Sequence, residues 1–96
     1  MTKTEKAFQD RVREVGCIVC LQQGYYSPCD LHHLLRGGRR IGEDFVIALC
    51  PMHHRSGLNT EKVVSRHPWR KEFERRYGTE TELLKKTRDL CGGLPE

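Results

Sequence analysis

Hydrophobic positions near the N-terminus recur at the spacing of one face of a helix. Phe8, Val12 and Val15 fall at i, i+4 and i+7. Gly16 follows them, and glycine commonly ends a helix. The pattern predicts a helix over residues 4–15 with an apolar face that packs on the remaining chain.

Two short apolar runs in the middle of the chain are typical of strands. They cover residues 31–35 and 45–49, and a segment with two glycines and three arginines, residues 36–40, separates them. This arrangement predicts an antiparallel hairpin with a loop longer than a tight turn. Ahead of the hairpin, residues 17–20 predict a tight turn between two cysteines, followed by a loop through residues 24–28.

Helical signals return in the C-terminal half. Pro51 suits the first turn of a helix that carries His53, His54 and Arg55. A second helix is predicted from Pro68 to residue 77, with Gly78 at its end. Its apolar stripe, which we expect to be buried, consists of Trp69, Phe73 and Tyr77.

A last helix is predicted from residue 79 to about Leu90. Thr79 and Glu82 have the spacing of a capping box, in which each side chain satisfies the backbone of the other. The order of elements predicts an α+β fold, and a length of 96 residues allows one domain, 1–96. Only 36% of the residues are hydrophobic, so the core should be thin and a second source of stability is expected.

Several classes of protein are disfavoured by composition. No apolar run reaches the roughly 18–20 residues of a membrane span, and the first residues lack the apolar stretch of a signal peptide. We therefore expect a cytoplasmic location, where structural disulfides are rare. Five cysteines beside five histidines then indicate metal binding.

Two pairs of residues have the spacing of zinc ligands. Cys17 and Cys20 form one C-x2-C pair, and Cys50 and His53 form a second pair after 29 intervening residues. Two such turns can complete a tetrahedron of four protein ligands, which is typical of structural zinc. His54 is an alternative to His53 as the fourth ligand.

The remaining histidines form a second group of candidates. His32 and His33 are neighbours on a predicted strand, so their side chains should point to opposite faces. His54 lies about 100° around its helix from His53 and can face the hairpin. His67 stands alone, and a surface or core position is almost as good an interpretation of it.

The excess of positive charge is concentrated in the middle of the chain. The formal charge is +4, and residues 36–76 contain ten basic and five acidic side chains. A basic region around candidate metal ligands is expected for a protein that binds phosphates or nucleic acid. Arg36, Arg39, Arg40 and Arg55 are candidate contacts, although a solvated basic surface would look the same.

These motifs resemble those of HNH nucleases, which have a ββα-metal (His-Me finger) core. Within that superfamily the chain resembles the phage recombination-enhancement (Ref), RecA-dependent nucleases. The resemblance covers residues 16–80 and includes GCIVC at 16–20, YSP at 26–28, HH at 32–33, LCP followed by HHR at 53–55, and YGTE at 77–80.

The resemblance implies a role for each candidate. His33 would be the general base, and His32, His54 and His67 would bind a catalytic divalent metal, which could be Mg²⁺, Mn²⁺, Zn²⁺ or Ni²⁺. The structural zinc would be held by Cys17, Cys20, Cys50 and His53, and Cys29 and Cys91 would be free thiols. It also implies a phage or prophage origin, DNA as substrate and action with a RecA-type filament in the host cytoplasm.

Two departures from the HNH pattern affect these roles. The asparagine that usually precedes the second strand has no counterpart, because residues 42–45 read GEDF. His67 also lies further along the chain than the usual third ligand, and Asn59 is a nearer substitute. Two other functions stay open: a non-catalytic zinc-finger module that binds DNA, and a phage adaptor for a recombinase or packaging enzyme.

Overall fold

The helix predicted at the N-terminus forms as α1 (Lys3–Val15) in the computed structural model of the chain, which describes residues 1–92. Thr2 and Glu5 form a capping box at its start, and Gly16 ends it with a φ of 78°. Phe8 and Val12 are fully buried, so the predicted apolar face is confirmed.

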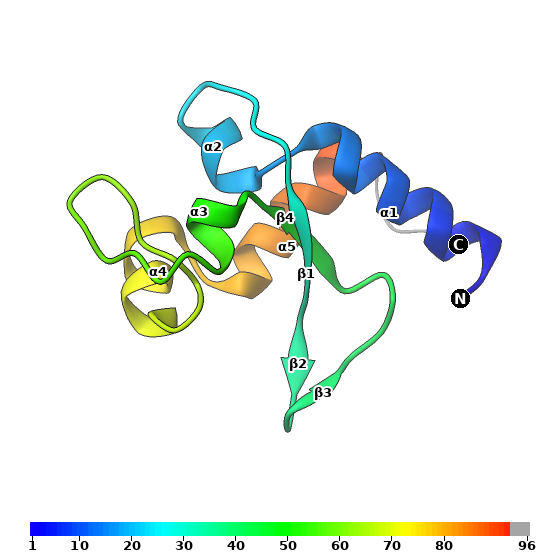
Figure 1. The fold of residues 1–96 in the computed structure, drawn as a ribbon. Coiled ribbons are helices and arrows are strands. Elements are labelled where there is room, and N and C mark those ends of the chain that lie inside the picture. Colours follow the sequence, from blue (N-terminus) through cyan, green and yellow to red (C-terminus); the bar gives the residue numbers. More distant parts are fainter. Residues whose placement is uncertain (93–96) are drawn as a thin grey trace.

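A two-stranded antiparallel hairpin lies at the centre of the fold (Figure 1). It pairs β1 (Asp30–His33) with β4 (Val46–Leu49), and His32 stands opposite Ile47. All four residues of β4 are buried because both faces of the strand are covered. Val46 packs in the core cluster that contains α1, whereas Ile47 packs in the cluster that contains α5 (Glu80–Leu90).

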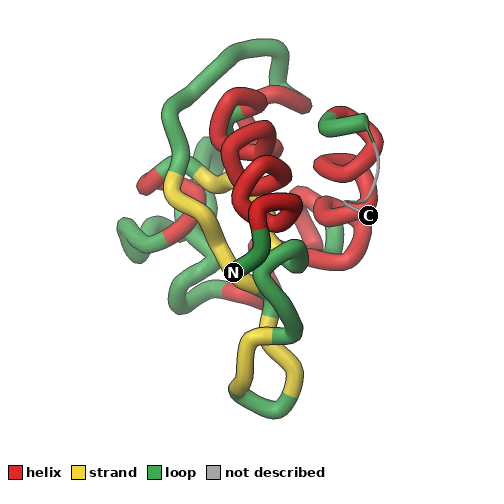
Figure 2. The backbone as a smooth tube through the Cα atoms, turned by 90° about the vertical axis from the view of Figure 1, so that its right-hand side faces the viewer, coloured by secondary structure: helices red, strands yellow, loops and turns green. Residues whose placement is uncertain are grey.

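The prediction of a loop over residues 36–40 is wrong, because most of this segment forms a second pair of strands. Strands β2 (Leu35–Arg36) and β3 (Arg39–Arg40) pair with each other and continue the hairpin. Gly37 and Gly38 have φ values of 58° and 79°, the positive values that a two-residue hairpin turn requires. The three arginines are therefore exposed on a projecting hairpin tip (Figures 1 and 2).

Two short helices present the predicted zinc ligands. The segment predicted as a plain turn is the start of α2 (Ile18–Gln22), which is N-capped by Cys17 because its Sγ accepts a hydrogen bond from the amide of Cys20 at 3.5 Å. Helix α3 (Pro51–His54) begins at Pro51 as predicted, has a single turn and packs against the hairpin.

The fourth helix, α4 (Arg70–Tyr77), begins two residues later than predicted. Phe73 is fully buried and Tyr77 packs against the same core, but Trp69 is 43% exposed. The prediction of a buried Trp69 is wrong because this residue precedes the first helical turn and does not follow the helical periodicity. Its indole N–H donates to the carbonyl oxygen of Gly57 at 3.0 Å instead.

This difference between Phe73 and Trp69 gives a test of the fold. We expect Phe73→Ala to lower the free energy of unfolding by about 3–5 kcal/mol because it empties a buried site. Trp69→Ala should cost only about 1 kcal/mol, the value of one hydrogen bond. Urea denaturation followed by circular dichroism measures both, and similar losses for the two variants would contradict the packing.

The predicted α+β class is confirmed, with the hairpin between α1 on one side and α3 and α5 on the other (Figure 1). The capping box of Thr79 and Glu82 also forms as predicted. Among residues 1–92, no helix combines the length and the apolar character needed to cross a membrane. The last four residues of the predicted domain, 93–96, lie outside the described part of the chain.

Candidate metal centres

The four predicted zinc ligands lie together in the core. The Sγ atoms of Cys20 and Cys50 are 3.7 Å apart, and Nδ1 of His53 is 3.5 Å from the first and 3.1 Å from the second. Cys17 completes the group, with its Sγ 3.6 Å from the same nitrogen. A tetrahedron of zinc ligands has edges of about 3.5–3.8 Å, so these donors surround a space suited to one ion.

The local fold explains why these donors converge. Cys17 and Cys20 stand three residues apart at the start of α2, and Cys50 and His53 have the same relation at the start of α3. His53, and not His54, lies with the three cysteines. The ring of Tyr77 packs edge-on against His53, with 5.2 Å between the ring centroids.

The chemistry of this group fits a bound cation. Burial raises the pKa of the Cys17 thiol to about 12 and also raises the pKa of Cys50, so thiolates at these two positions need a positive ion beside them. Burial lowers the pKa of His53, which keeps its imidazole neutral and able to ligate. The four residues are buried and all positions of a tetrahedron are filled, as in a structural zinc site.

A second group contains His32, His54 and His67. Each offers one ring nitrogen, and these atoms lie within 4.8 Å of one another. The closest pair, Nδ1 of His32 and Nε2 of His54, is separated by 3.3 Å. His32 is buried, His54 half-buried and His67 exposed, so this three-histidine cluster opens to solvent at His67.

Two carboxylates contact the outer ring nitrogens of His32 and His54, which are the nitrogens that do not face each other. Nε2 of His32 is 3.3 Å from Glu80, and Nδ1 of His54 is 3.2 Å from Asp30. In metal sites a carboxylate at the outer nitrogen fixes the tautomer and direction of a histidine ligand. The arrangement therefore leaves the inner nitrogens of both rings free to face an ion.

Both carboxylates are ionised at neutral pH. Burial would raise the pKa of Glu80, but its hydrogen bonds with His32 and Arg66 outweigh burial and hold the pKa at about 2. Hydrogen bonds with Arg55, and then with His54, lower the pKa of Asp30. The negative charges raise the ability of the adjacent imidazoles to bind a cation.

Two of the rings, those of His54 and His67, are favoured in their neutral, metal-binding form. Burial lowers the pKa of His54, against an opposing hydrogen bond with Asp30. Burial, and then the charge of Arg66, lowers the pKa of His67. The donor set and its charge state fit a divalent cation held by three imidazoles.

Two backbone hydrogen bonds join the cysteine-rich group to the three-histidine cluster. The amide of Arg66 donates to the carbonyl oxygen of His53 at 2.7 Å, and the amide of His67 donates to that of His54 at 2.9 Å. These bonds align residues 66–67 beside α3 and bring His67 to the cluster. His67 thus lies with the other two histidines, whereas Asn59 lies in a loop where it pairs with Val64.

His33 lies apart from the three-histidine cluster. It alternates with His32 along β1 and points to the face of the hairpin that α1 covers. There Nε2 of His33 is 3.3 Å from the carboxylate of Glu43, which also accepts a hydrogen bond from Gln9 of α1 at 3.1 Å. Hydrogen bonds with His33 and then Gln9 lower the pKa of Glu43.

The predicted phosphate contacts occupy two separate places. Arg55 is held beside the three-histidine cluster, because its Nε donates to Asp30 at 2.7 Å. Arg36, Arg39 and Arg40 are on the exposed hairpin tip, and Arg40 lies 3.9 Å from Glu43. Cys29 and Cys91 belong to neither candidate metal group, as predicted.

Sequence patterns did not indicate the three carboxylates that contact the histidines. Asp30 had a usable signal, because it stands two residues before His32 and so shares its face of the strand. Glu43 stands in the GEDF segment that replaces the usual asparagine, but its contact with His33 has no sequence signal. Glu80 is part of the YGTE match, but no local pattern connects it with His32, which lies 48 positions away.

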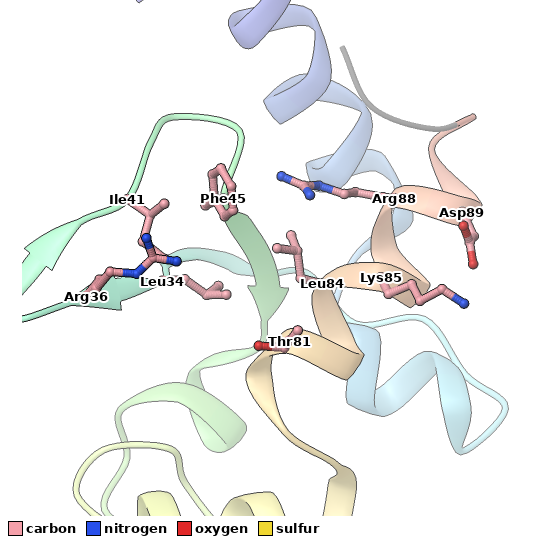
Figure 3. Close-up of a pocket in the computed structure, with 9 residues that line it drawn as sticks. All are labelled: Leu34, Arg36, Ile41, Phe45, Thr81, Leu84, Lys85, Arg88 and Asp89. Carbon is pink, nitrogen blue, oxygen red and sulfur yellow. The ribbon is translucent and has the colours of Figure 1, made fainter.

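A separate hollow of 420 Å³ lies between the hairpin and α5 (Figure 3). Its walls are mainly apolar, with Leu34, Ile41, Phe45 and Leu84 among them, and it includes none of the clustered cysteines or histidines. Arg88 crosses to the hairpin side, where its guanidinium lies 4.6 Å from the ring centroid of Phe45 and donates to the carbonyl oxygen of Asp44 at 3.0 Å. These contacts brace the segment that carries Glu43.

The comparison with known proteins identifies the family. No curated protein matches the chain. A family model described as "Recombination enhancement, RecA-dependent nuclease" matches residues 1–91, which include both candidate metal groups and all the carboxylates around them. The chain therefore belongs to the family of RecA-dependent nucleases of recombination enhancement.

Proposed function

We propose that this protein is a metal-dependent HNH endonuclease that hydrolyses DNA phosphodiester bonds. The observation that carries the proposal is the open three-histidine cluster, which is formed by a hairpin strand, the helix after the hairpin and the segment that carries His67. In this proposal β1, β4 and α3 are the ββα-metal core, and residues 1–96 form one nuclease domain of phage or prophage origin.

The two groups of ligands differ in a way that separates a structural from a catalytic role. Cys17, Cys20, Cys50 and His53 would fill all four positions around zinc. His32, His54 and His67 would hold a divalent ion with positions left open toward solvent. When bound, that ion would supply positive charge to the phosphate and to the leaving oxygen.

His33 is the proposed general base, which takes a proton from the attacking water. Because Glu43 is ionised, Nε2 of His33 carries the proton in their hydrogen bond and Nδ1 is left as the proton acceptor. Within residues 1–92 no further strand pairs with the outer edge of β1. A phosphodiester at that free edge would have His32 on one side and His33 on the other.

The arginines would bind neighbouring phosphates of the same DNA. Arg55 is fixed next to His54 through Asp30, which suits a phosphate close to the scissile bond. Arg36, Arg39 and Arg40 project on the hairpin tip and would contact the backbone further away. Such contacts position DNA and carry no sequence preference by themselves.

The nuclease proposal is tested with purified protein and supercoiled plasmid in the presence of Mg²⁺, Mn²⁺, Zn²⁺ or Ni²⁺, with and without a RecA-type filament on single-stranded DNA. We expect metal-dependent breakage that increases with the filament. DNA binding without breakage under all these conditions would instead favour a zinc-finger module. Binding to the filament without breakage or independent DNA binding would favour an adaptor.

The carboxylate behind His54 gives a prediction about metal affinity. We expect Asp30→Ala to raise the metal concentration needed for half-maximal cleavage by about 10- to 100-fold, because His54 loses the partner that orients it. A metal titration of plasmid cleavage measures the change. The matched control is Asp10→Ala, which removes an exposed carboxylate on α1 that pairs with Lys6 and should leave the titration unchanged.

A further inference from the structure

The exposed indole of Trp69 has no role in the chemistry proposed above. Trp69 is the only tryptophan in the chain and directly precedes α4, two residues after His67. It is 43% exposed, although an aromatic ring of this size favours burial. Single exposed apolar side chains are common on protein surfaces, so the argument for a ligand depends on how this ring is held and what surrounds it.

The indole is held in one orientation. Its N–H donates to the carbonyl oxygen of Gly57 at 3.0 Å, and Gly57 lies three residues after His54. The ring therefore bridges the two segments that follow the cluster histidines His54 and His67. A fixed aromatic face loses little conformational freedom when a flat ligand stacks on it.

The surroundings of Trp69 favour a polyanion. It lines an open hollow of 550 Å³ together with Pro68, Arg70, Lys71 and Glu72. The charges of Glu72 and Arg70 are both paired, since Glu72 contacts Arg75 and Arg76, and Arg70 contacts Glu74. Lys71 therefore leaves this set with a net positive charge.

The wider segment around Trp69, residues 66–76, is also positively charged. Residues 66–76 contain five basic and two acidic side chains. Among the described residues, the exposed Lys71 has no acidic partner within ion-pair distance. The combination of an aromatic face and cationic neighbours is typical of single-stranded nucleic-acid binding sites.

We propose that Trp69 stacks on an unpaired DNA base next to the three-histidine cluster. The inference rests on the proposed nuclease function and names Trp69 as a residue that positions the substrate by holding an unpaired base. Two residues of chain separate the Cα atoms of Trp69 and His67 by at most about 7.6 Å. Trp69 and the cluster histidine His67 are therefore close enough along the chain for one DNA strand to reach both.

The single tryptophan makes stacking directly measurable. The protein is titrated with a 16-nucleotide oligothymidylate and with a blunt duplex of the same length, without added catalytic metal. We expect the single strand to quench the tryptophan fluorescence and the duplex to leave it nearly unchanged. Equal quenching by both, or none by the single strand at saturating binding, would overturn the proposal.

Variants separate stacking from general electrostatic binding, with fluorescence anisotropy of labelled DNA as the readout. Trp69→Leu should weaken binding of the single strand by about 5- to 150-fold and leave duplex binding unchanged. Trp69→Phe should restore most of the affinity. The matched control is Tyr26→Leu, which removes another exposed aromatic ring, 60% exposed, and should alter neither affinity.

The outcomes distinguish this inference from the proposed function. Wild-type protein that cleaves DNA while Trp69→Leu binds single strands normally would overturn the stacking role and leave the nuclease intact. If the single strand quenched Trp69 but no metal or filament condition gave cleavage, the proposed nuclease function would be wrong and the base-binding site would stand. If Trp69→Leu lost only stimulation by the filament, with normal single-strand binding, Trp69 would belong to a protein interface and the stacking proposal would be wrong.

Discussion

Cys17→Ser is expected to leave most of the protein unfolded. Structural zinc supplies about 10–16 kcal/mol of apparent binding free energy in zinc-finger peptides at neutral pH, while whole domains are stable by about 5–15 kcal/mol. Loss of one thiolate ligand from the buried group would thus remove a large part of the stability. Circular dichroism, thermal unfolding and the zinc content per chain measure the effect.

Cys29→Ser is the matched control, because Cys29 is only partly buried and lies outside both candidate metal groups. It should keep one structural zinc per chain and a melting temperature close to that of the unchanged protein. A Cys17→Ser variant that stays folded with cooperative unfolding would mean that the cysteine-rich group does not hold the fold together.

His33→Ala is expected to abolish cleavage while the fold, the zinc content and DNA binding persist. Removal of a general base typically slows a reaction by about 10²- to 10⁴-fold. His33 is outside the three-histidine cluster, so the variant should keep its metal ligands. Single-turnover cleavage of plasmid at saturating metal measures the rate of the chemical step.

The contact of His33 with Glu43 requires a control for a purely structural role. Gln9→Ala removes the hydrogen bonds from α1 to Glu43 but leaves His33 in place, so it should retain most of the cleavage activity. If Gln9→Ala lost as much activity as His33→Ala, the His33–Glu43 pair would serve only to hold α1 on the hairpin. Normal cleavage by His33→Ala would exclude it as the base.

Elements with strong local signals were predicted from the sequence. The face of α1 with Phe8 and Val12, the capping box of Thr79 and Glu82, and the zinc-type spacing of the cysteines all follow from neighbouring residues. Spacing alone left open which histidine joins the cysteines. The structure resolves that alternative, because His53 lies with the three cysteines and His54 lies with His32 and His67.

The parts that were missed depend on contacts between distant segments. The pairing of His32 with Glu80 requires α5 to pack against the hairpin, and no local pattern encodes that distance. The i, i+4 spacing of Trp69 and Phe73 predicts a buried Trp69, but such spacing applies only inside a helix and α4 begins at Arg70. The double glycine at 37–38 predicts a loop, whereas β-pairing on both sides of a turn depends on the partner strand.

The single turn of α3 carries neighbouring histidines of the two candidate metal groups, and this has a consequence for metal loading. An ion at His53 would fix the backbone that positions His54, directly and through residues 66–67. Occupancy of the first site should therefore raise the affinity of the second, and reciprocity requires the converse. Nuclease activity would then follow the zinc supply of the cell, even where magnesium serves the reaction itself.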